Sequence, residues 1–255
     1  MTRISYGLTE GAWKHFARTV EELAVWPGTR VCDLGGGATP VLPPSIVETR
    51  RIDYTLVDIS SDELAKAPDG YRKVCADLTH TSPPLDGHHD VIVSRCFAEH
   101  VPHPHAFHEN VLRMLAPGGR AVHFFSTLYS LPFVVNRVLP ENVSQWLINH
   151  AQPKRVRDGQ VRDVEQAEPA SELDPPTGKW PAYYRWCRGP TPAQIRRFER
   201  LGFEVESYAG FFGTPRYYTR VRPLERFDVW LADRLVEHPI ALYTSFAQVL
   251  LRRPE

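Results

Sequence analysis

The stretch from Thr29 to Pro40 reads T-R-V-C-D-L-G-G-G-A-T-P, and about one crossover later Tyr54 to Ile59 reads Y-T-L-V-D-I. The first apolar run ends in three consecutive glycines, which permit positive φ angles and admit a ligand where any Cβ would collide. The second run ends in Asp58, whose carboxylate at a strand terminus can accept hydrogen bonds from both hydroxyls of a ribose. Together the two runs indicate a pocket for an adenosine-containing ligand.

Apolar runs that are typical of strands continue along the chain, separated by segments that can hold helices or turns. The sequence predicts strands at 29–34, 52–57, 72–76, 89–95 and 119–125. This alternation favours an α/β fold with a parallel, doubly wound, Rossmann-like sheet. A helix expected over 104–115 ends at Pro117-Gly118-Gly119, a stop signal that leads directly into the last of these strands.

The flanking segments complete one expected domain over 1–255. Apolar positions at helical spacing over 8–25 predict an amphipathic helix, so residues 1–27 are expected to form an N-terminal helical cap. Towards the other end, Thr191 is expected to cap a helix that Gly202 closes. A strand at 203–208, a helix near 224–236 and a final strand over 243–254 follow.

Between residues 127 and 190 the strand and helix alternation stops, which indicates an insertion. Residues 153–176 are polar and rich in proline, and predict a mobile loop. The insertion ends in an aromatic cluster that includes Tyr183, Tyr184 and Trp186. We expect these side chains, together with Phe212, to bind substrate under a lid, since aromatic side chains build apolar pockets with polar tips. The alternative is a hydrophobic plug that fixes the insertion to the domain.

Composition excludes several classes of partner. Thirty basic and thirty acidic residues cancel, and no basic cluster interleaved with aromatics predicts binding to nucleic acid. No stretch approaches a membrane span and the N-terminus has no apolar signal core, so we expect a cytoplasmic protein that binds no membrane. The four scattered cysteines favour buried thiols over a metal or disulfide.

The glycine loop does not fit the dinucleotide fingerprint G-x-G-x-x-G. Counting from Gly35, the third glycine position is occupied by Pro40, which has no amide to offer a pyrophosphate. A nicotinamide oxidoreductase is therefore disfavoured.

The acidic residue followed by G-x-G, here Asp33-Leu34-Gly35-Gly36-Gly37, resembles the first motif of class I S-adenosylmethionine-dependent methyltransferases. Thr39 stands where the family usually has a further glycine. Two later stretches also look like the group that acts on small molecules: A-E-H-V-P at 98–102 and R-M-L-A-P-G-G at 113–119. The resemblance covers 28–126 well and the last 60 residues more weakly. It implies a mostly parallel sheet of seven strands whose last strand is antiparallel.

The resemblance also implies a set of site residues for S-adenosylmethionine and its product S-adenosylhomocysteine. Asp33 would bind the methionine amino group, Asp58 the ribose hydroxyls and Asp77 the adenine amino group, with Ile59 flanking the adenine. The full expected set is Asp33, Gly35, Gly36, Gly37, Asp58, Ile59, Asp77, Leu78, Ser94 and Arg95. For Asp33 and Asp77 the alternative is that each carboxylate only caps a turn.

Four histidines lie close together at His100, His103, His105 and His108. Pro102 and Pro104 place them on a turn that enters a helix, so their side chains are expected to diverge and no metal site is predicted. His100 follows the fourth expected strand on the side where open α/β sheets hold ligands. It is the candidate general base, since an imidazole suits proton removal near neutrality. The alternative, that His100 only packs on the turn, stays open.

The function indicated is methyl transfer from S-adenosylmethionine to a small-molecule acceptor, on oxygen or nitrogen, by in-line attack in a closed aromatic pocket. The distinctive insertion favours biosynthesis of a secondary metabolite. A methyltransferase-like module that binds or assembles without catalysis is the alternative. The sequence leaves the acceptor and the oligomeric state undetermined.

Overall fold

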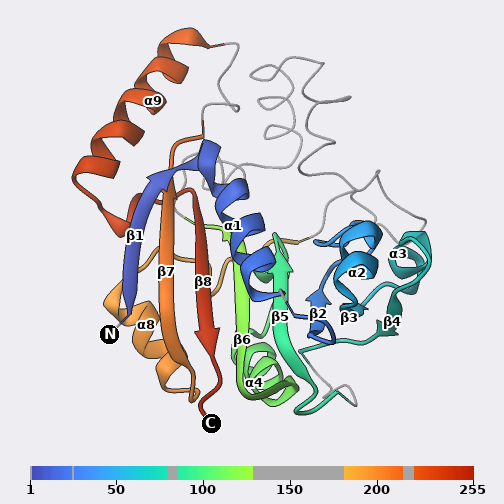
Figure 1. Ribbon diagram of the computed structural model, residues 1–255. Coiled ribbons are helices and arrows are strands. Elements are labelled where there is room, and N and C mark those ends of the chain that lie inside the picture. The colour runs from blue at the N-terminus through green and yellow to red at the C-terminus, as the bar shows by residue number, and fades with distance from the viewer. Residues whose placement is uncertain (1, 25, 80–84, 129–180, 215–220) are drawn as a thin grey trace.

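One mixed sheet of eight strands organises the computed structural model, which describes all residues except 1, 25, 80–84, 129–180 and 215–220. Its strand order is β1-β7-β8-β6-β5-β2-β3-β4 (Figure 1). The strands are β1 (Arg3–Leu8), β2 (Arg30–Leu34), β3 (Asp53–Asp58), β4 (Arg72–Cys75), β5 (His89–Arg95), β6 (Leu115–Ser126), β7 (Glu204–Phe212) and β8 (Phe246–Arg252). The helices are α1 (Thr9–Leu23), α2 (Pro44–Arg50), α3 (Ser61–Lys66), α4 (Pro104–Met114), α8 (Pro192–Glu199) and α9 (Arg222–Glu237), with a 3₁₀ turn η1 (Ala98–His100).

The strands expected from the apolar runs all form, and they are parallel. β2 pairs with β3 on one side and with β5 on the other, so the chain reverses its winding direction between β2 and β5. Ligands of open α/β sheets bind outside the carboxyl ends of the strands at such a reversal. The glycine loop that follows β2 and the turn that follows β5 both lie there.

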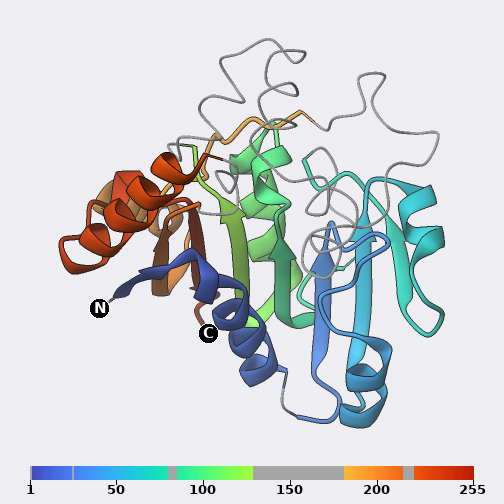
Figure 2. The same cartoon turned by 90° about the horizontal axis from the view of Figure 1, so that it is seen from above.

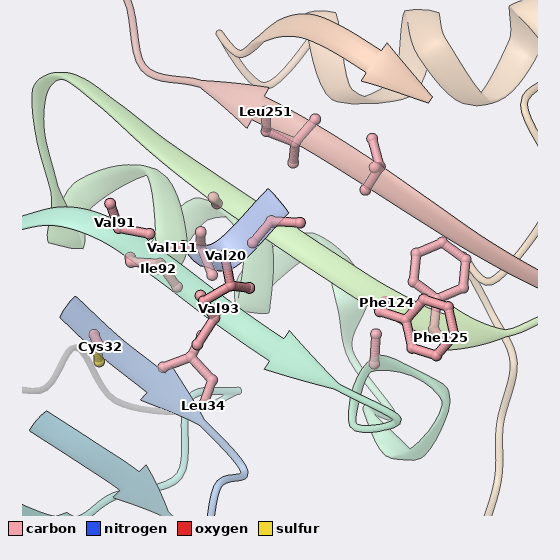
Figure 3. Close-up of a cluster of buried hydrophobic side chains, with 14 of the residues drawn as sticks. Val20, Cys32, Leu34, Val91, Ile92, Val93, Val111, Phe124, Phe125 and Leu251 are labelled. Atoms are coloured by element: carbon pink, nitrogen blue, oxygen red, sulfur yellow. The ribbon is translucent and has the colours of Figure 1, made fainter. Parts of the chain in front are cut away.

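Helices cover both faces of the sheet. Successive side chains of β6 point to opposite faces, and each face contacts a different helix. Phe124 stacks on Phe16 of α1 with ring centroids 5.4 Å apart, whereas the neighbouring His123 contacts Phe107 of α4 at 5.8 Å. Figure 3 shows buried side chains at this level, with Val20 from α1 and Val111 from α4 beside the strands. The layers confirm the doubly wound α/β fold.

The junction from α4 to β6 lies close to its predicted position. The helix ends at Met114, and β6 already begins at Leu115, which pairs with His89 before a register shift in the ladder. A Cβ on Gly119 would lie 2.9 Å from the carbonyl oxygen of Ala116 and 3.0 Å from that of His89. Glycine is therefore required where the strand turns onto β5.

The N-terminal segment differs from the expected helical cap. Arg3–Leu8 forms a strand that pairs in parallel with β7, so the sheet has eight strands where seven were expected. Helix α1 starts only at Thr9, whose hydroxyl donates to the carbonyl of Phe212 at 3.0 Å. R-I-S-Y-G-L alternates between polar and apolar residues, but this pattern is only six residues long and runs directly into the helical pattern that begins at Leu8. Arg3, Ile4 and Ser5 are exposed because β1 is an edge strand.

The C-terminal elements follow the prediction. The Thr191 hydroxyl accepts a hydrogen bond from the amide of Gln194 at 3.2 Å and so caps α8. β8 runs antiparallel to both of its neighbours, β6 and β7. α9 contacts β1 and β7 at the end of the sheet opposite β4, as Figures 1 and 2 show. In the described residues, no helix is both long and apolar enough to cross a bilayer.

Most of the predicted lid over 127–190, including the 153–176 loop, lies outside the described residues. Its last part, from Pro181 onward, is described and runs across the turn after β5.

Candidate active site

The glycine loop after β2 is packed so closely that side chains are excluded from it. Gly35 has a φ of +70°, and a Cβ there would lie 2.2 Å from the Phe97 ring. A Cβ on Gly36 would lie 2.7 Å from Oδ2 of Asp33, and Gly37 has a φ of +36°. Thr39, the departure from the family motif, closes the loop as a turn by donating its amide to the carbonyl of Gly36 at 2.8 Å. The loop therefore reaches a tight conformation without a further glycine.

Asp33 lies directly beneath this loop and is 1% exposed. Its Oδ2 accepts hydrogen bonds from the amide of Val41 at 2.7 Å and from the hydroxyl of Tyr54 at 2.8 Å. Burial raises the pKa of Asp33 to about 6, against the lowering effects of these two donors and of Arg95. Its Oδ1 is buried and has no hydrogen-bond partner among the described residues. An unpaired carboxylate oxygen at this place suits a cationic group of a ligand.

Asp58 ends β3 next to the glycine loop, as predicted. A Cβ on Gly37 would lie 3.1 Å from its Oδ2, and its Oδ1 accepts the amide of Ser60 at 2.9 Å. Burial raises the pKa of Asp58, while the amides of Ser60, Ile59 and Gly37 lower it. The next residue, Ile59, is 55% exposed although it is apolar.

Asp77 and Leu78 follow β4, farther along the same edge of the sheet. Oδ1 of Asp77 accepts from the amide and hydroxyl of Thr79 at 2.8 and 2.7 Å. This geometry caps a turn and leaves its adenine-binding role a prediction. Leu78 is buried, and its carbonyl accepts from the side chain of Asn110 in α4 at 2.6 Å.

The two predicted cofactor residues of β5 have different surroundings. The Ser94 side chain is fully buried, with its hydroxyl 2.8 Å from Nδ1 of His123. Ser94 pairs with Leu34, directly before the glycine loop, and its side chain contacts the neighbouring strand β6. Arg95 donates to the carbonyl of Thr39 at 3.1 Å and so links the β5 end to that loop.

His100 ends the η1 turn after β5. Its Nδ1 lies 3.1 Å from the carbonyl oxygen of Pro181. Because a carbonyl only accepts, Nδ1 is the donor in this contact, which leaves Nε2 as the ring nitrogen that can accept a proton. The arrangement is consistent with the base role and joins His100 to the described end of the predicted lid.

The four histidines diverge. His105 lies on the surface, with Nδ1 3.1 Å from Glu109, whereas His108 is buried and its Nδ1 lies 2.6 Å from the carbonyl of Pro104. Within the described parts of the chain, no group of three or more His, Cys, Asp or Glu is placed to share a metal ion.

The predicted substrate residues separate into two groups. The amides of Tyr183 and Tyr184 donate to the carbonyl of Glu99 at 2.7 and 3.1 Å, which places both residues beside His100. Trp186 instead stacks on His108 with ring centroids 5.0 Å apart and packs edge-on against Phe198 of α8. Its contacts are those of a plug between α4 and α8.

Phe212 is also placed away from the other candidates. It is 1% exposed and packs with Ala232 and Leu235 of α9, and its ring stacks on Tyr6 of β1. Phe212 was expected to bind substrate, but its side chain is buried under α9. Its position at a strand end in the sequence did not reveal this burial.

Three residues of this site were not predicted. Tyr54 and Phe97 support Asp33 and Gly35, and Glu99 is a buried carboxylate next to His100. Tyr54 begins the Y-T-L-V-D-I run and Glu99 stands in A-E-H-V-P, so both lay inside the quoted motifs. The signal that could have identified Tyr54 and Glu99 as site residues was a polar group within an otherwise apolar motif.

The comparisons with known proteins agree with this geometry. A family model described as a methyltransferase domain matches residues 12–208. No curated protein sequence matches the chain. An S-adenosylmethionine-dependent methyltransferase from Mesorhizobium loti is 20% identical over 96% of this chain and 99% of its own, with a TM-score of 0.52. A second one, from Archaeoglobus fulgidus, is 15% identical over 96% and 94%, with a TM-score of 0.54.

A third structure is larger than this chain. Phosphoethanolamine N-methyltransferase 2 from Haemonchus contortus, in complex with S-adenosylmethionine, is 13% identical over 96% of this chain, with a TM-score of 0.53. The chain spans 53% of that protein's length. At these identities the structures establish the fold, and the family model establishes the family. The chain belongs to the methyltransferase domain family and has the Rossmann-like fold of the S-adenosylmethionine-dependent methyltransferases.

Proposed function

We propose that this chain transfers a methyl group from S-adenosylmethionine to a hydroxyl or amino group of a small molecule. One observation carries the proposal. Asp33, the glycine loop and Asp58 meet at the carboxyl ends of the paired strands β2 and β3, and a Cβ on any of the three glycines would contact a side chain there.

The residues fit this cofactor. The buried Oδ1 of Asp33 has no described partner and would accept a hydrogen bond from the methionine ammonium group. The Asp58 carboxylate would accept from the ribose hydroxyls, and the exposed Ile59 beside it offers an apolar surface to the adenine. When bound, S-adenosylmethionine supplies a methyl group already activated by a sulfonium, and S-adenosylhomocysteine is the product.

The protein then contributes position and a base. Methyl transfer needs in-line attack, so holding the acceptor in place supplies much of the acceleration. Nε2 of His100 would take the proton that the acceptor hydroxyl or amine loses, because Nδ1 is engaged with the carbonyl of Pro181. Tyr183 and Tyr184 would form the wall beside it and exclude water.

Calorimetry on a pair of variants tests the cofactor assignment. Asp58→Ala should weaken S-adenosylmethionine binding by about 1.5 to 3 kcal/mol, the contribution of hydrogen bonds to a charged group. Asp53→Ala, at the opposite end of the same strand, is the matched control and should keep the wild-type affinity. Unchanged affinity in Asp58→Ala would remove the basis for the proposal.

Turnover separates an enzyme from a binding module. The wild-type protein is incubated with S-adenosylmethionine carrying a tritiated methyl group and with a panel of small hydroxyl and amine acceptors. Transfer to any acceptor supports the proposed activity. Tight cofactor binding without transfer to any of them would favour a module that binds but does not catalyse.

A further inference from the structure

Glu99 is a buried acid whose carboxylate the proposed reaction does not yet use. It lies in the η1 turn immediately before His100 and is 4% exposed. Its Oε1 accepts from the hydroxyl of Ser126 at 2.7 Å and from the amide of the same residue at 3.3 Å. Ser126 ends β6, so these bonds fix the carboxylate against the sheet at the edge where the candidate site lies.

The second oxygen of this carboxylate is unpaired. Oε2 is buried and has no hydrogen-bond partner in the described part of the chain. Leaving a carboxylate oxygen unpaired away from water costs free energy, and such a group in a native protein points to a functional role or to a bound water or ion. A donor that carries positive charge compensates this cost best.

Two side chains near the carboxylate, those of Tyr184 and Cys187, are neutral at pH 7. Burial raises the pKa of Tyr184 to about 12, with Glu99 adding to the effect, and the hydroxyl of Tyr184 is hydrogen-bonded to Ser126. Burial and then Glu99 also raise the pKa of Cys187 well above its usual range. Neither of these two side chains gives the carboxylate a cationic partner. The nearby cation, Arg188, donates to the carbonyls of Tyr184 and Cys187.

The main chain ties this carboxylate to the proposed base. The carbonyl of Glu99 accepts the amides of Tyr183 and Tyr184, and the next residue, His100, contacts the carbonyl of Pro181. Glu99, His100 and the aromatic segment thus form one unit at the carboxyl end of β5. A ligand group that reaches Oε2 lies next to the residue proposed to take its proton.

We propose that Glu99 determines the acceptor class by pairing its Oε2 with a protonated amino group of the acceptor. The inference rests on the proposed methyl transfer and narrows it to amines. An alcohol of the same shape would leave the buried oxygen without a cationic partner, so the site discriminates against it.

The test measures binding to the protein saturated with S-adenosylhomocysteine. The probes are two matched pairs, 2-phenylethylamine with 2-phenylethanol and 1-aminobutane with 1-butanol. Calorimetry measures the affinity of each probe. The wild type should bind each amine at least about tenfold more tightly than its alcohol, and Glu99→Gln should abolish the preference, since an amide has no charge to pair. Equal binding within each pair, binding of neither amine, or a preference that survives in Glu99→Gln overturns the inference.

Two further measurements separate recognition from a structural role. Glu99→Gln keeps an oxygen for Ser126, so its thermal unfolding midpoint should stay at or above that of the wild type. A fall of several degrees would instead mark Glu99 as a structural brace and overturn the inference. Ser126→Ala removes the hydroxyl that donates to Glu99 but keeps the Glu99 carboxylate, so this variant should keep the preference for amines.

The cofactor titration distinguishes the two proposals. Failure of the methyl-transfer proposal appears as absent S-adenosylmethionine binding in every variant. Failure of the Glu99 proposal appears with cofactor binding intact.

Discussion

The hydroxyl of Tyr54 on β3 donates a 2.8 Å hydrogen bond to Oδ2 of Asp33 on the neighbouring strand β2. The same hydroxyl accepts the amide of Leu42 at 3.2 Å, and the carbonyl of Leu42 accepts the hydroxyl of Tyr71 at 2.9 Å. This chain of bonds fixes the segment after the glycine loop and orients the carboxylate, which leaves Oδ1 available.

Tyr54→Phe should therefore weaken cofactor binding and change its pH dependence. The pKa of Asp33 is about 6 and the Tyr54 hydroxyl lowers it, so removing this donor raises the pKa further and reduces the ionised fraction near pH 7. We expect a loss of about 1 to 1.5 kcal/mol in S-adenosylmethionine affinity at pH 7, and a binding midpoint at higher pH. Calorimetry between pH 5.5 and 8.5 measures both.

Tyr71→Phe is the control for this variant. It removes a hydrogen bond of the same network without a direct bond to Asp33. Its binding midpoint should lie closer to that of the wild type. The same pH profile in wild type and Tyr54→Phe would show that Tyr54 has only a structural role.

Gly35→Ala should disrupt the loop, because its Cβ would lie 2.2 Å from the Phe97 ring at a φ of +70°. Gly70→Ala is a matched control, since Gly70 has a φ of +95° but nothing within 4 Å of the added Cβ. Gly70→Ala should cost only the backbone strain, about 1 kcal/mol. Gly35→Ala should cost clearly more, in unfolding free energy or in cofactor affinity. Equal costs would mean that Phe97 moves aside freely.

His100→Gln should lower turnover and spare cofactor binding. A positioned base contributes about 10²-fold or more to the rate, and His100 is the proposed base. Rates near pH 7 and the S-adenosylmethionine affinity are measured together. His103→Gln, just before α4, is the control and should keep the wild-type rate. A fully active His100→Gln enzyme would limit His100 to packing on the turn.

Acid should destabilise the fold through histidines buried between α4 and the sheet. Burial lowers the pKa of His108 to about 4 and that of His123 well below its usual range. Below pH 6.5 these histidines bind protons in the unfolded chain but not in the folded chain. The free energy of unfolding therefore falls as the pH drops from about 6.5 to 4. His108 alone accounts for about 3 kcal/mol of this loss.

Denaturant unfolding at several pH values measures the effect. Asp33 acts in the opposite direction between pH 6 and 4, since its raised pKa favours proton uptake by the folded state. The decisive comparison is therefore between wild type and His108→Gln, whose loss of stability towards pH 4 should be smaller. His105→Gln, on the exposed side of α4, should keep most of the loss, because His105 is the smallest of the effects on the pKa of His108.

Much of the sheet was predictable because its signals are local. The run from Val31 to Leu34 is apolar except for Asp33 and leads into glycines, and Thr191 followed by Pro192 marks a helix start in the sequence itself. The strand Arg3–Leu8 was not predictable in the same way, because it is stabilised by pairing with a segment some two hundred residues away. Its alternation of polar and apolar residues is only six residues long and adjoins the longer helical pattern over 8–25.

In the candidate site too, features that depend on local sequence were predictable and features that depend on distant contacts were not. Asp33, Gly35 and Asp58 lie where the motif placed them, because strand ends and glycine loops fix their neighbours. Trp186 and Phe212 instead pack against neighbouring helices, because the position of an aromatic residue in the sequence does not show which face of the domain its side chain contacts. Tertiary packing decided these positions.

The pairing of β1 with β7 has a consequence for how the chain is made. The first strand of the chain has no partner until residues 204–212 have left the ribosome. Pairing between strands so far apart in sequence is slow. β1 therefore joins the sheet only after β7 has been synthesised, although β2 to β6, which lie between them in sequence, pair with one another earlier in the chain.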